Sequence, residues 1–330
     1  MMKRAILDKL RENPGGFVSG EELSKSAGVT RAAIWKHIKQ LKEEGYHIES
    51  ISRRGYLLKG EPDILDGKAL EMRMKTGKTI KKIIHFDSID STNTMAKALA
   101  SQGEMEGTVV IAEEQTGGRG RLGRQWISPK GTGIWMSMIL RPEIEPSEAA
   151  KITQVAAAAV TMAIRESTGC DAGIKWPNDI IINGKKVCGI LTEMSGELNS
   201  VNFIVLGIGM NVNVNREDFP LELQNIAASI KEFSVKTVSR KEMVVKIFEK
   251  FEELYADFVY HKSIKCSLDI CMKYSVTLRK QVRIIQRGRE TLGEALDITD
   301  EGELVIKDLE GNIQKVVSGE VSVRGITDYI

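Results

Sequence analysis

One short stretch of this chain combines glycines and arginines at a density typical of ligand-binding loops. Gly118-Arg119-Gly120-Arg121-Leu122-Gly123 matches the G-x-G-x-x-G pattern of dinucleotide-binding folds. That pattern must open a helix so that a pyrophosphate lies at the helix N-terminus, but no helix fits Arg124-Gln125-Trp126-Ile127-Ser128-Pro129, which follows. Glycine lets the backbone approach a ligand, and arginine pairs with carboxylate or phosphate. We therefore expect a glycine-hinged basic loop that binds an anion; an unoccupied flexible basic loop is the alternative.

Other common types of catalytic chemistry lack the residues that they need. No Ser, Cys or His arrangement for nucleophilic catalysis is evident, and the four histidines have no metal-ligand spacing. The four cysteines contain no Cys-x-x-Cys pair, so neither a zinc site nor a disulfide framework is expected. The N-terminus meets charged residues before any apolar run, and no stretch approaches the ~18 apolar residues of a membrane span. A cytoplasmic protein without a membrane partner is expected.

The charge of the chain is unevenly distributed. Residues 1–60 carry 12 Lys/Arg and 7 Asp/Glu, a net charge of +5, whereas the remaining 270 residues have a net charge of −3. A basic module in front of a nearly neutral body indicates that only the module meets a polyanion.

The basic module predicts three short helices followed by a hairpin. Ser19 and Glu22 form a capping box that opens the second helix, and Thr30 is a suitable N-cap for a third helix over residues 31–44. Residues 47–51 and 56–58 flank a hairpin tip that holds two arginines. This order is typical of a winged helix-turn-helix, whose third helix enters the major groove while the wing touches phosphate or the minor groove.

The predicted DNA contacts lie on the outward face of the third helix, at the two caps and at the wing tip. They are Ser19, Thr30, Arg31, Lys36, His37, Lys39, Gln40, Arg53 and Arg54. The alternative is a small helical domain with a solvated basic face, because lysine and arginine are common on exposed helix surfaces.

The rest of the chain first mixes strands with helices and then contains only short strands. Strands are expected at residues 82–86, 108–113, 134–140, 174–176, 180–182, 188–194 and 202–208. Ser147 is expected to cap a long helix that ends at Gly169, and Ser239 with Glu242 to open another. Alternating segments from residue 275 onward predict a small β-barrel. We expect an α+β protein of three domains, at residues 1–64, 65–274 and 275–330.

Four motifs in one order resemble those of the biotin–protein ligase family. They are Asp90-Ser91-Thr92-Asn93, the loop Gly118–Trp126, Lys175-Trp176-Pro177-Asn178-Asp179 with Lys186-Val187-Cys188-Gly189-Ile190-Leu191, and Gly207-Ile208-Gly209-Met210-Asn211-Val212-Asn213. The basic winged module in front narrows the resemblance to the bifunctional class, biotin ligase plus biotin-operon repressor. The resemblance implies an α/β biotin-ligase catalytic domain with a mixed sheet and an SH3-like C-terminal barrel.

The resemblance also implies a two-step reaction and its cofactors. The biotin carboxylate attacks the α-phosphate of ATP, with Mg²⁺, to give biotinyl-adenylate, and a lysine of an acceptor protein then attacks the mixed anhydride. Two anions meet in the first step, so the site needs fixed cations. Lys186 and Arg121 are the expected catalytic residues. Taken alone, Lys186 would be a surface lysine in the hairpin loop Asn183-Gly184-Lys185-Lys186.

The expected ligand contacts are residues of these motifs, together with Gln115, whose amide group both donates and accepts hydrogen bonds. Those for biotin are Ser91, Thr92, Asn93, Gln115, Arg119, Gly120, Arg121, Lys186, Gly189, Gly207 and Gly209. Those for ATP are Arg119, Arg121, Trp126, Asn178, Asp179 and Asn211, and Asp179 is expected to contact the magnesium ion. Ser91-Thr92-Asn93 is also a suitable helix N-cap, which is the alternative for that segment.

The resemblance implies three partners. They are the biotin carrier domain of a biotin-dependent carboxylase, operator DNA, and a second copy of the chain when biotinyl-adenylate is bound. The resemblance implies that an ordered biotin loop, beside an exposed sheet edge at residues 202–208, completes the dimer surface. Two alternatives stay open: a lipoate-type ligase, against which the arginine-rich loop and the DNA module argue, and a ligand-sensing repressor without ligase activity, against which Lys186 argues.

Overall fold

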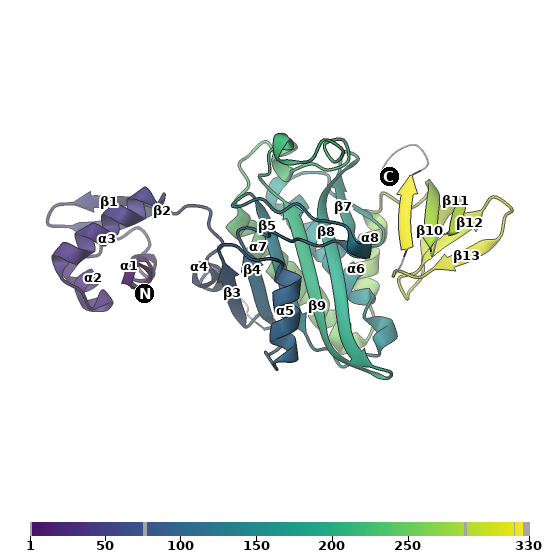
Figure 1. Cartoon of the computed structure of the whole chain (residues 1–330), viewed down its shortest axis with the longest axis horizontal. Helices are drawn as coiled ribbons and strands as arrows, with labels where there is room; N and C mark the ends of the chain where they lie inside the picture. The colour runs from purple at the N-terminus through teal and green to yellow at the C-terminus, as the bar shows by residue number, and fades with distance from the viewer. Residues whose placement is uncertain (1, 75–77, 287–288, 320, 326–330) are drawn as a thin grey trace. The chain divides into compact units, whose positions relative to one another are not determined.

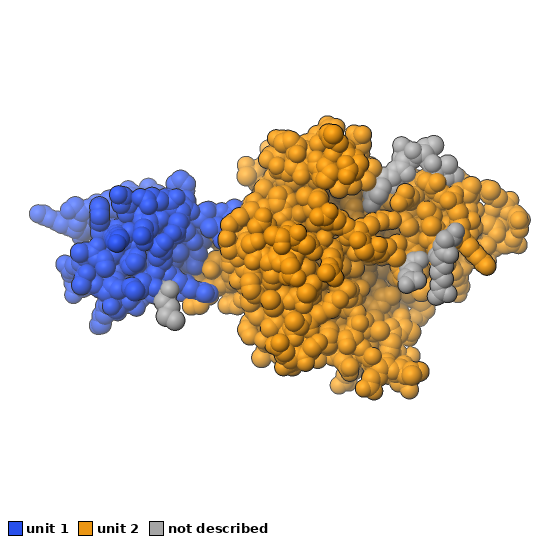
Figure 2. All heavy atoms as spheres, viewed as in Figure 1, with its two compact units in different colours: residues 1–64 blue, residues 65–330 orange. Residues whose placement is uncertain are grey.

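The computed structural model describes residues 2–74, 78–286, 289–319 and 321–325. The chain divides into two compact units, Met1–Ile64 and Leu65–Ile330 (Figure 2). Each unit has its own apolar core. None of the helices in the described parts of the chain is long and apolar enough to cross a membrane.

The first unit is a winged helix-turn-helix, as predicted. Its elements are α1 (Met2–Arg11), α2 (Gly20–Ala27), α3 (Arg31–Glu43), β1 (His47–Ile51) and β2 (Gly55–Gly60). Both halves of the capping box form, because Ser19 Oγ accepts from the Glu22 N–H and the Glu22 carboxylate accepts from the Ser19 N–H. Thr30 Oγ1 accepts from the Ala33 N–H and caps α3. The two caps therefore fix the residues at which α2 and α3 begin.

The wing is the antiparallel hairpin of β1 and β2. Arg53 at its tip has φ 66°, a left-handed conformation that few non-glycine residues adopt. Gly55 has φ 105°, and a Cβ there would lie 2.1 Å from the carbonyl oxygen of Val18. The wing needs glycine at this position because residue 18 pairs with Tyr56 beside it.

The second unit contains a seven-stranded mixed sheet, which confirms the predicted fold class. Its strand order is β3-β4-β5-β9-β8-β7-β6. Strands β3 and β4 are parallel, and every other neighbouring pair is antiparallel. The strands are β3 (Lys82–Phe86), β4 (Thr108–Ala112), β5 (Gly133–Leu140), β6 (Gly173–Lys175), β7 (Asp179–Ile182), β8 (Lys185–Glu197) and β9 (Ser200–Asn211).

Helices cover the two faces of this sheet (Figure 1). Helices α6 (Lys151–Thr168) and α7 (Arg240–His261) share the large core cluster with inward residues such as Met136 and Ile208. Helix α5 (Thr92–Ser101) packs on the opposite face, where Ala96 and Ala100 meet outward residues of β4, β5 and β9. Two short helices, α4 (Gly67–Glu71) and α8 (Lys265–Lys273), complete the unit.

Residues 281–325 form a five-stranded antiparallel sheet with the order β13-β12-β11-β10-β14. Its strands are β10 (Gln281–Gln286), β11 (Arg289–Ile298), β12 (Leu304–Asp308), β13 (Ile313–Val316) and β14 (Val321–Gly325). The carbonyl oxygen of Gly302 accepts hydrogen bonds from Gln154 Nε2 and Trp176 Nε1, at 2.6 and 3.1 Å. These buried bonds join the small sheet to the α/β part of the unit.

Three expectations about single elements are wrong. Residues 202–208 lie in β9, which runs between β5 and β8, so they form no sheet edge. Ser147 caps no helix, because residues 146–148 form a 3₁₀ turn and α6 begins at Lys151. Lys186 is the second residue of β8, and the turn before it is Asn183-Gly184.

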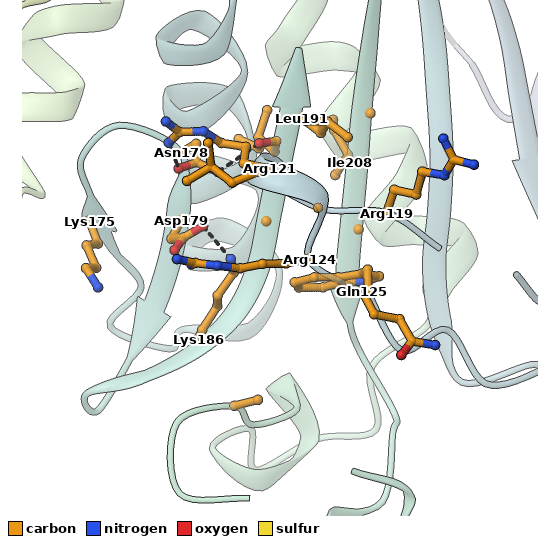
Figure 3. Close-up of a pocket in the computed structure, with 18 of the residues that line it drawn as sticks. Arg119, Arg121, Arg124, Gln125, Lys175, Asn178, Asp179, Lys186, Leu191 and Ile208 are labelled. Carbon is orange, nitrogen blue, oxygen red and sulfur yellow. Dashed lines mark hydrogen bonds and ion pairs between the residues drawn. The ribbon is translucent and has the colours of Figure 1, made fainter. Parts of the chain in front are cut away.

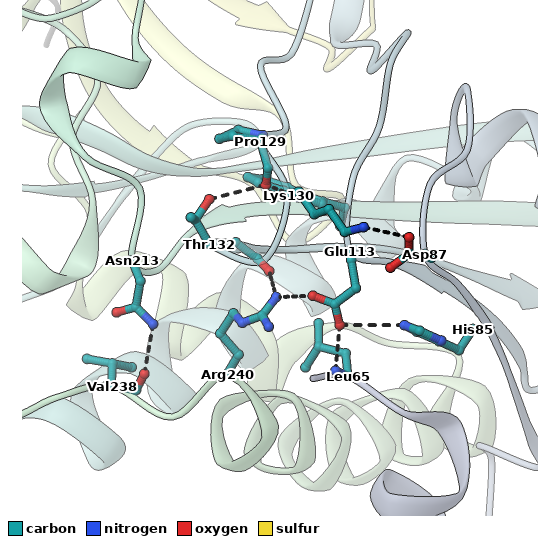
Figure 4. Close-up of polar contacts among 12 residues, drawn as sticks. Leu65, His85, Asp87, Glu113, Pro129, Lys130, Thr132, Asn213, Val238 and Arg240 are labelled. Carbon is teal, nitrogen blue, oxygen red and sulfur yellow. Dashed lines mark hydrogen bonds and ion pairs between the residues drawn. The ribbon is translucent and has the colours of Figure 1, made fainter. Parts of the chain in front are cut away.

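A buried polar cluster ties the first residue of the second unit to its core (Figure 4). The Glu113 carboxylate accepts from the Leu65 N–H at 2.6 Å and from Arg240 Nη1 at 2.8 Å. His85 Nε2 lies 3.5 Å from the same carboxylate. Although burial opposes it, the charge of Arg240 and hydrogen bonds from His85 and Leu65 lower the pKa of Glu113 to about 2. The cluster joins β3, β4 and α7 at the point where the chain enters the second unit.

Candidate active site

All 15 residues expected to contact biotin or ATP line one cavity of about 470 Å³ in the second unit. That volume is within the range of small-molecule sites. The first half of β8 and the last residues of β9 line the cavity, together with the loop of residues 119–127, the start of α5, residues 175–179 and β14. Figure 3 shows part of this lining, from Arg119 to Lys186 and Ile208. The structure therefore brings the predicted site residues together, although their ligand contacts remain a prediction.

The floor of the cavity is a pair of glycines covered by an indole. A Cβ on Gly209 would lie 2.6 Å from Trp126 Nε1, and one on Gly189 would lie 3.1 Å from both the Trp126 ring and Lys186 Cε. Lys186 Nζ lies 5.1 Å from the centroid of the Trp126 ring. Gly189 and Gly209 are paired residues of β8 and β9. A larger residue at position 209 would displace Trp126, and one at position 189 would press on both Trp126 and Lys186.

Lys186 is fixed in both its backbone and its side chain. Its N–H donates to the Ile226 carbonyl at 2.8 Å, and its carbonyl accepts from the Ala228 N–H at 3.0 Å. Its Nζ lies 2.5 Å from Asp179 Oδ1, at the start of β7. The ammonium group therefore has a defined place at the cavity wall, which the hairpin alternative for Lys186 does not provide.

Arg121 connects three separate segments of the unit. Its Nη1 donates to Asn178 Oδ1 at 2.7 Å, and its Nη2 donates to the carbonyl oxygens of Val321, at 2.9 Å, and Gly319. Burial lowers the pKa of Arg121, and the charge of Asp179 acts in the opposite direction. In Figure 3 Arg119 points away from the Asp179–Lys186 pair, so the three arginines of the loop have different surroundings.

Hydroxyl and amide groups line the part of the cavity near the start of α5. Gln115 Oε1 accepts from the N–H and the hydroxyl of Thr92, at 2.9 and 3.0 Å, and Gln115 Nε2 donates to Ser128 Oγ at 2.9 Å. Ser91 Oγ accepts from the Thr94 N–H, so Ser91 caps α5 as the alternative for this segment requires. These groups suit a neutral ligand that both donates and accepts hydrogen bonds.

The sequence did not predict part of the cavity wall. Phe219, Leu223, Ile226 and Ala227 line it, and so do three cationic residues, Lys175, Arg283 and Arg324. Burial lowers the pKa of Lys175, which is 4% exposed, to about 8. The sequence signal for Lys175 was a lysine at the end of an otherwise apolar strand. Residues 219–227 carry no such signal, because their apolar side chains resemble ordinary core residues.

In the first unit, the predicted DNA contacts differ in their solvent exposure and in their hydrogen bonds within the protein. Arg31, Lys36 and Lys39 are exposed on α3, whereas His37 and Gln40 are half-buried. The Ser19 and Thr30 side chains accept the helix-capping hydrogen bonds. Arg54 stacks on Phe17, with the guanidinium carbon 4.6 Å from the ring centroid. Trp35, which the sequence did not single out, is 63% exposed on the same helix.

Three family models match this chain. Residues 85–211 match the biotin/lipoate A/B protein ligase family, residues 3–57 match an HTH domain, and residues 277–324 match the biotin protein ligase C terminal domain. The three matches follow one another along the chain in the order that the sequence predicts for DNA module, catalytic domain and C-terminal domain.

Relatives match nearly the whole chain. The bifunctional ligase/repressor BirA of Bacillus spizizenii is 38% identical over 98% of both chains, and that of Escherichia coli is 29% identical over 94% of both. The structure of a biotin protein ligase from Aquifex aeolicus in complex with biotin and ATP superposes with a TM-score of 0.64 and 30% identity. The superposition covers 74% of this chain and 100% of the Aquifex aeolicus chain.

Proposed function

Since this chain belongs to the BirA family of bifunctional ligase/repressors, we propose that it attaches biotin to proteins in an ATP-dependent reaction and represses biotin genes. The observation that carries the ligase function is the cavity itself. Its wall holds the cations Lys186 and Arg121 and also, near the start of α5, the hydroxyl and amide of Thr92 and Gln115. A ligand with an anionic end and a neutral polar end, such as biotin, matches this polarity.

In the first step, an oxygen of the biotin carboxylate attacks the α-phosphate of ATP, and pyrophosphate leaves with the electrons of the broken P–O bond. Lys186 and Arg121 offset the repulsion between the two anions and stabilise the charge that develops in the transition state. Asp179 holds the Lys186 ammonium in place, at 2.5 Å. Trp126 and Asn178 bound the space for the nucleotide, beside Asn211, whose Oδ1 is buried without a hydrogen-bond partner.

In the second step, the amine of an acceptor lysine attacks the carbonyl carbon of biotinyl-adenylate. AMP leaves, and the amine loses a proton as the amide forms. No nucleophile of this chain is required, because adenylation has already activated the carboxyl group. Positioning and electrostatic stabilisation carry the catalysis. We propose the biotin carrier domain of a biotin-dependent carboxylase as the acceptor.

The residues that surround the cavity do not form a magnesium cage. Among the described residues no group of three or more His, Cys, Asp or Glu side chains is arranged to hold a metal ion. Asp179 is already paired with Lys186. Magnesium is commonly bound through substrate phosphates and one or two carboxylates, so we propose that it arrives as the ATP complex, with Asp179 as its nearest protein carboxylate.

The winged unit is proposed to bind operator DNA. Helix α3 enters the major groove with Arg31, Lys36 and Lys39, and Arg53 at the wing tip contacts phosphate. A single module makes few base contacts, so a dimer on a two-fold operator is proposed, with biotinyl-adenylate as the signal for dimerisation. Residues 202–208 offer no free sheet edge for this dimer, because β9 lies between β5 and β8.

A cytoplasmic location is proposed because all four cysteines, which lie in the described residues, are free thiols and the reaction consumes ATP.

The decisive test is biotin-dependent exchange of labelled pyrophosphate into ATP, followed by transfer of biotin to a carrier domain. We expect exchange with biotin and none with lipoate, and transfer to the carrier lysine. Exchange with lipoate alone would favour the lipoate-type ligase. Binding of biotin without exchange or transfer would favour a ligand-sensing repressor.

A further inference from the structure

A chain of hydrogen bonds leads from buried groups at the cavity to a partly exposed carboxylate outside it. Asn93 Nδ2 donates to Glu193 Oε2 at 2.8 Å. Ser137 Oγ lies 2.5 Å from Asn93 Oδ1 and 2.7 Å from Thr92 Oγ1. Glu193 Oε1 also accepts from Lys97 Nζ at 2.5 Å. Glu193 does not line the cavity, but Asn93 and Thr92 do.

The register of three strands explains why these groups meet. Ser137 pairs with Gly207, and Gly207 pairs with Leu191, so the three form one row across β5, β9 and β8. Glu193 lies two residues beyond Leu191 and therefore on the same face of the sheet. Asn93 enters this row from α5, and a Cβ on Gly207 would lie 2.2 Å from Asn93 Oδ1. Glycine at position 207 thus makes room for the Asn93 amide.

Glu193 sets the direction of the hydrogen bonds that Asn93 makes in this chain. A carboxylate only accepts, so the Asn93 atom that faces it must be the amide nitrogen, and the amide oxygen must face Ser137. The Ser137 hydroxyl has one hydrogen, and the Asn93 oxygen at 2.5 Å requires it. The Thr92 hydroxyl then gives its hydrogen to Ser137 or to Gln115. In both arrangements Thr92 Oγ1 keeps a lone pair that can accept a hydrogen bond from a ligand in the cavity, which Thr92 lines.

We propose that Glu193 is a positioning residue for biotin: through Asn93 and Ser137 it holds Thr92 Oγ1 as a hydrogen-bond acceptor for an N–H of the substrate. This inference rests on the proposed ligase function and names a specificity determinant that does not touch the ligand. Its physical basis is that Ser137, Asn93 and Thr92 are buried, so each must be satisfied within the protein or by the ligand.

The test compares Michaelis constants in biotin-dependent pyrophosphate exchange. Glu193→Ala leaves the Asn93 amide free to turn. We expect KM for biotin to rise about tenfold, since leaving a buried polar group without its hydrogen bond weakens binding by about this factor. KM for ATP should stay within twofold. Glu193→Gln restores an acceptor oxygen for Asn93 Nδ2, so we expect KM for biotin to rise less than about threefold. An unchanged KM for biotin in Glu193→Ala would overturn the proposal.

Two control variants separate positioning from surface charge and from strand stability. Lys97→Ala removes only the exposed ion-pair partner of Glu193 and should leave KM within twofold. Glu197→Ala removes an exposed glutamate of the same strand and should have no effect. An equal rise in Lys97→Ala or Glu197→Ala would also overturn the proposal.

A double-mutant cycle with Ser137→Ala gives a second, independent readout. If Glu193 acts through Ser137, the rise in KM of the double variant should be close to that of the larger single variant. Multiplicative effects would show that the two residues act separately and would overturn the relay. Absence of exchange in the unmodified protein would instead overturn the proposed function, and with it this inference.

Discussion

Lys186 and Asp179 form an ion pair of 2.5 Å across the adjacent strands β7 and β8, at the wall of the cavity. A bulge between Ile180 and Ile181 shifts the register of these strands, so that Asp179 pairs with Gly189 while Ile181 pairs with Lys186. The pair therefore depends on a local irregularity. The ion pair holds the Lys186 ammonium in position before any substrate binds. This reduces the entropy that is lost on reaching the transition state.

The first prediction concerns Lys186. Lys186→Ala should lose roughly 2–4 kcal/mol of transition-state stabilisation, because a fixed cation no longer offsets the charge on the biotin carboxyl and the α-phosphate. The loss should appear in the rate of biotinyl-adenylate formation in single turnovers. The matched control is Lys185→Ala, the preceding residue of β8. A folded Lys186→Ala variant with an unchanged rate would contradict the catalytic assignment.

The second prediction concerns Arg121, which joins the loop of residues 117–126 to Asn178 and to the carbonyl oxygen of Val321. Arg121→Ala should speed the release of biotinyl-adenylate by about tenfold or more, because hydrogen bonds to charged groups contribute about 1.5–3 kcal/mol. Stopped-flow release of the adenylate measures it. Arg124→Ala removes the same charge from an exposed neighbour and should have a smaller effect; an effect equal to that of Arg121→Ala would contradict the bridging role.

The third prediction concerns the pH dependence of stability. The pKa of Glu113 is lowered from 4.5 to about 2, so its contribution is fully present above pH 4.5 and is lost as pH falls through 2. That difference corresponds to about 3 kcal/mol. Unfolding midpoints in urea between pH 6 and pH 2.5 should therefore fall more steeply for the natural protein than for Glu113→Gln.

Glu113→Gln should also lower stability at neutral pH by about 3–5 kcal/mol, because it removes the carboxylate charge of Glu113 from its buried ion pair with Arg240. Glu114→Gln is the control: it changes the adjacent glutamate, whose carboxylate binds the Ser88 hydroxyl near the surface. Parallel pH profiles for the natural protein and Glu113→Gln would show that Glu113 does not carry this dependence.

Most elements could be predicted from the sequence because their signals are local. The capping box at Ser19, the cap at Thr30 and the glycine that ends α6 involve residues a few positions apart, and each forms as expected. Ser147 fails for an equally local reason. Glu145 and Glu148 bond reciprocally around Pro146, which closes a 3₁₀ turn, so the helix begins four residues after the serine.

The position of β9 was wrongly predicted although the sequence holds the relevant signal. Residues 203–208 are apolar or glycine without alternation, and a continuous apolar run is typical of a strand that is buried on both faces. By contrast, no local signal predicts that Asp179 meets Lys186 or that residues 219–227 return to the cavity. These contacts depend on strand register and on long-range packing, which a single sequence does not specify.

The fourth prediction concerns the wing. Replacing Arg53 and Arg54 together by alanine should weaken binding to all DNA sequences. It should also make the negative slope of log K against log salt shallower by about 1–2, since each phosphate contact contributes about 0.9 to its magnitude. Titrations of operator and unrelated DNA at several salt concentrations measure this. Lys59→Ala removes an exposed charge of β2 that is paired with Glu49, and should change the slope less. Weaker binding to the operator alone would mean that the wing reads bases.

The last prediction joins the two activities. Biotinyl-adenylate accumulates when acceptor protein is exhausted and is consumed while acceptor remains, so it is a suitable signal for biotin supply. If it promotes dimerisation, the apparent dimer dissociation constant should fall when biotin and ATP are added, and operator binding should tighten in parallel, because coupling between two binding events is reciprocal. Sedimentation of the full chain with and without biotin and ATP measures the first effect.

A variant lacking residues 1–64, the first compact unit, should still form the adenylate and ligate biotin but lose operator binding. An unchanged monomer–dimer equilibrium, together with operator binding that is indifferent to biotin and ATP, would show that the DNA-binding unit is not governed by the intermediate of the ligase reaction.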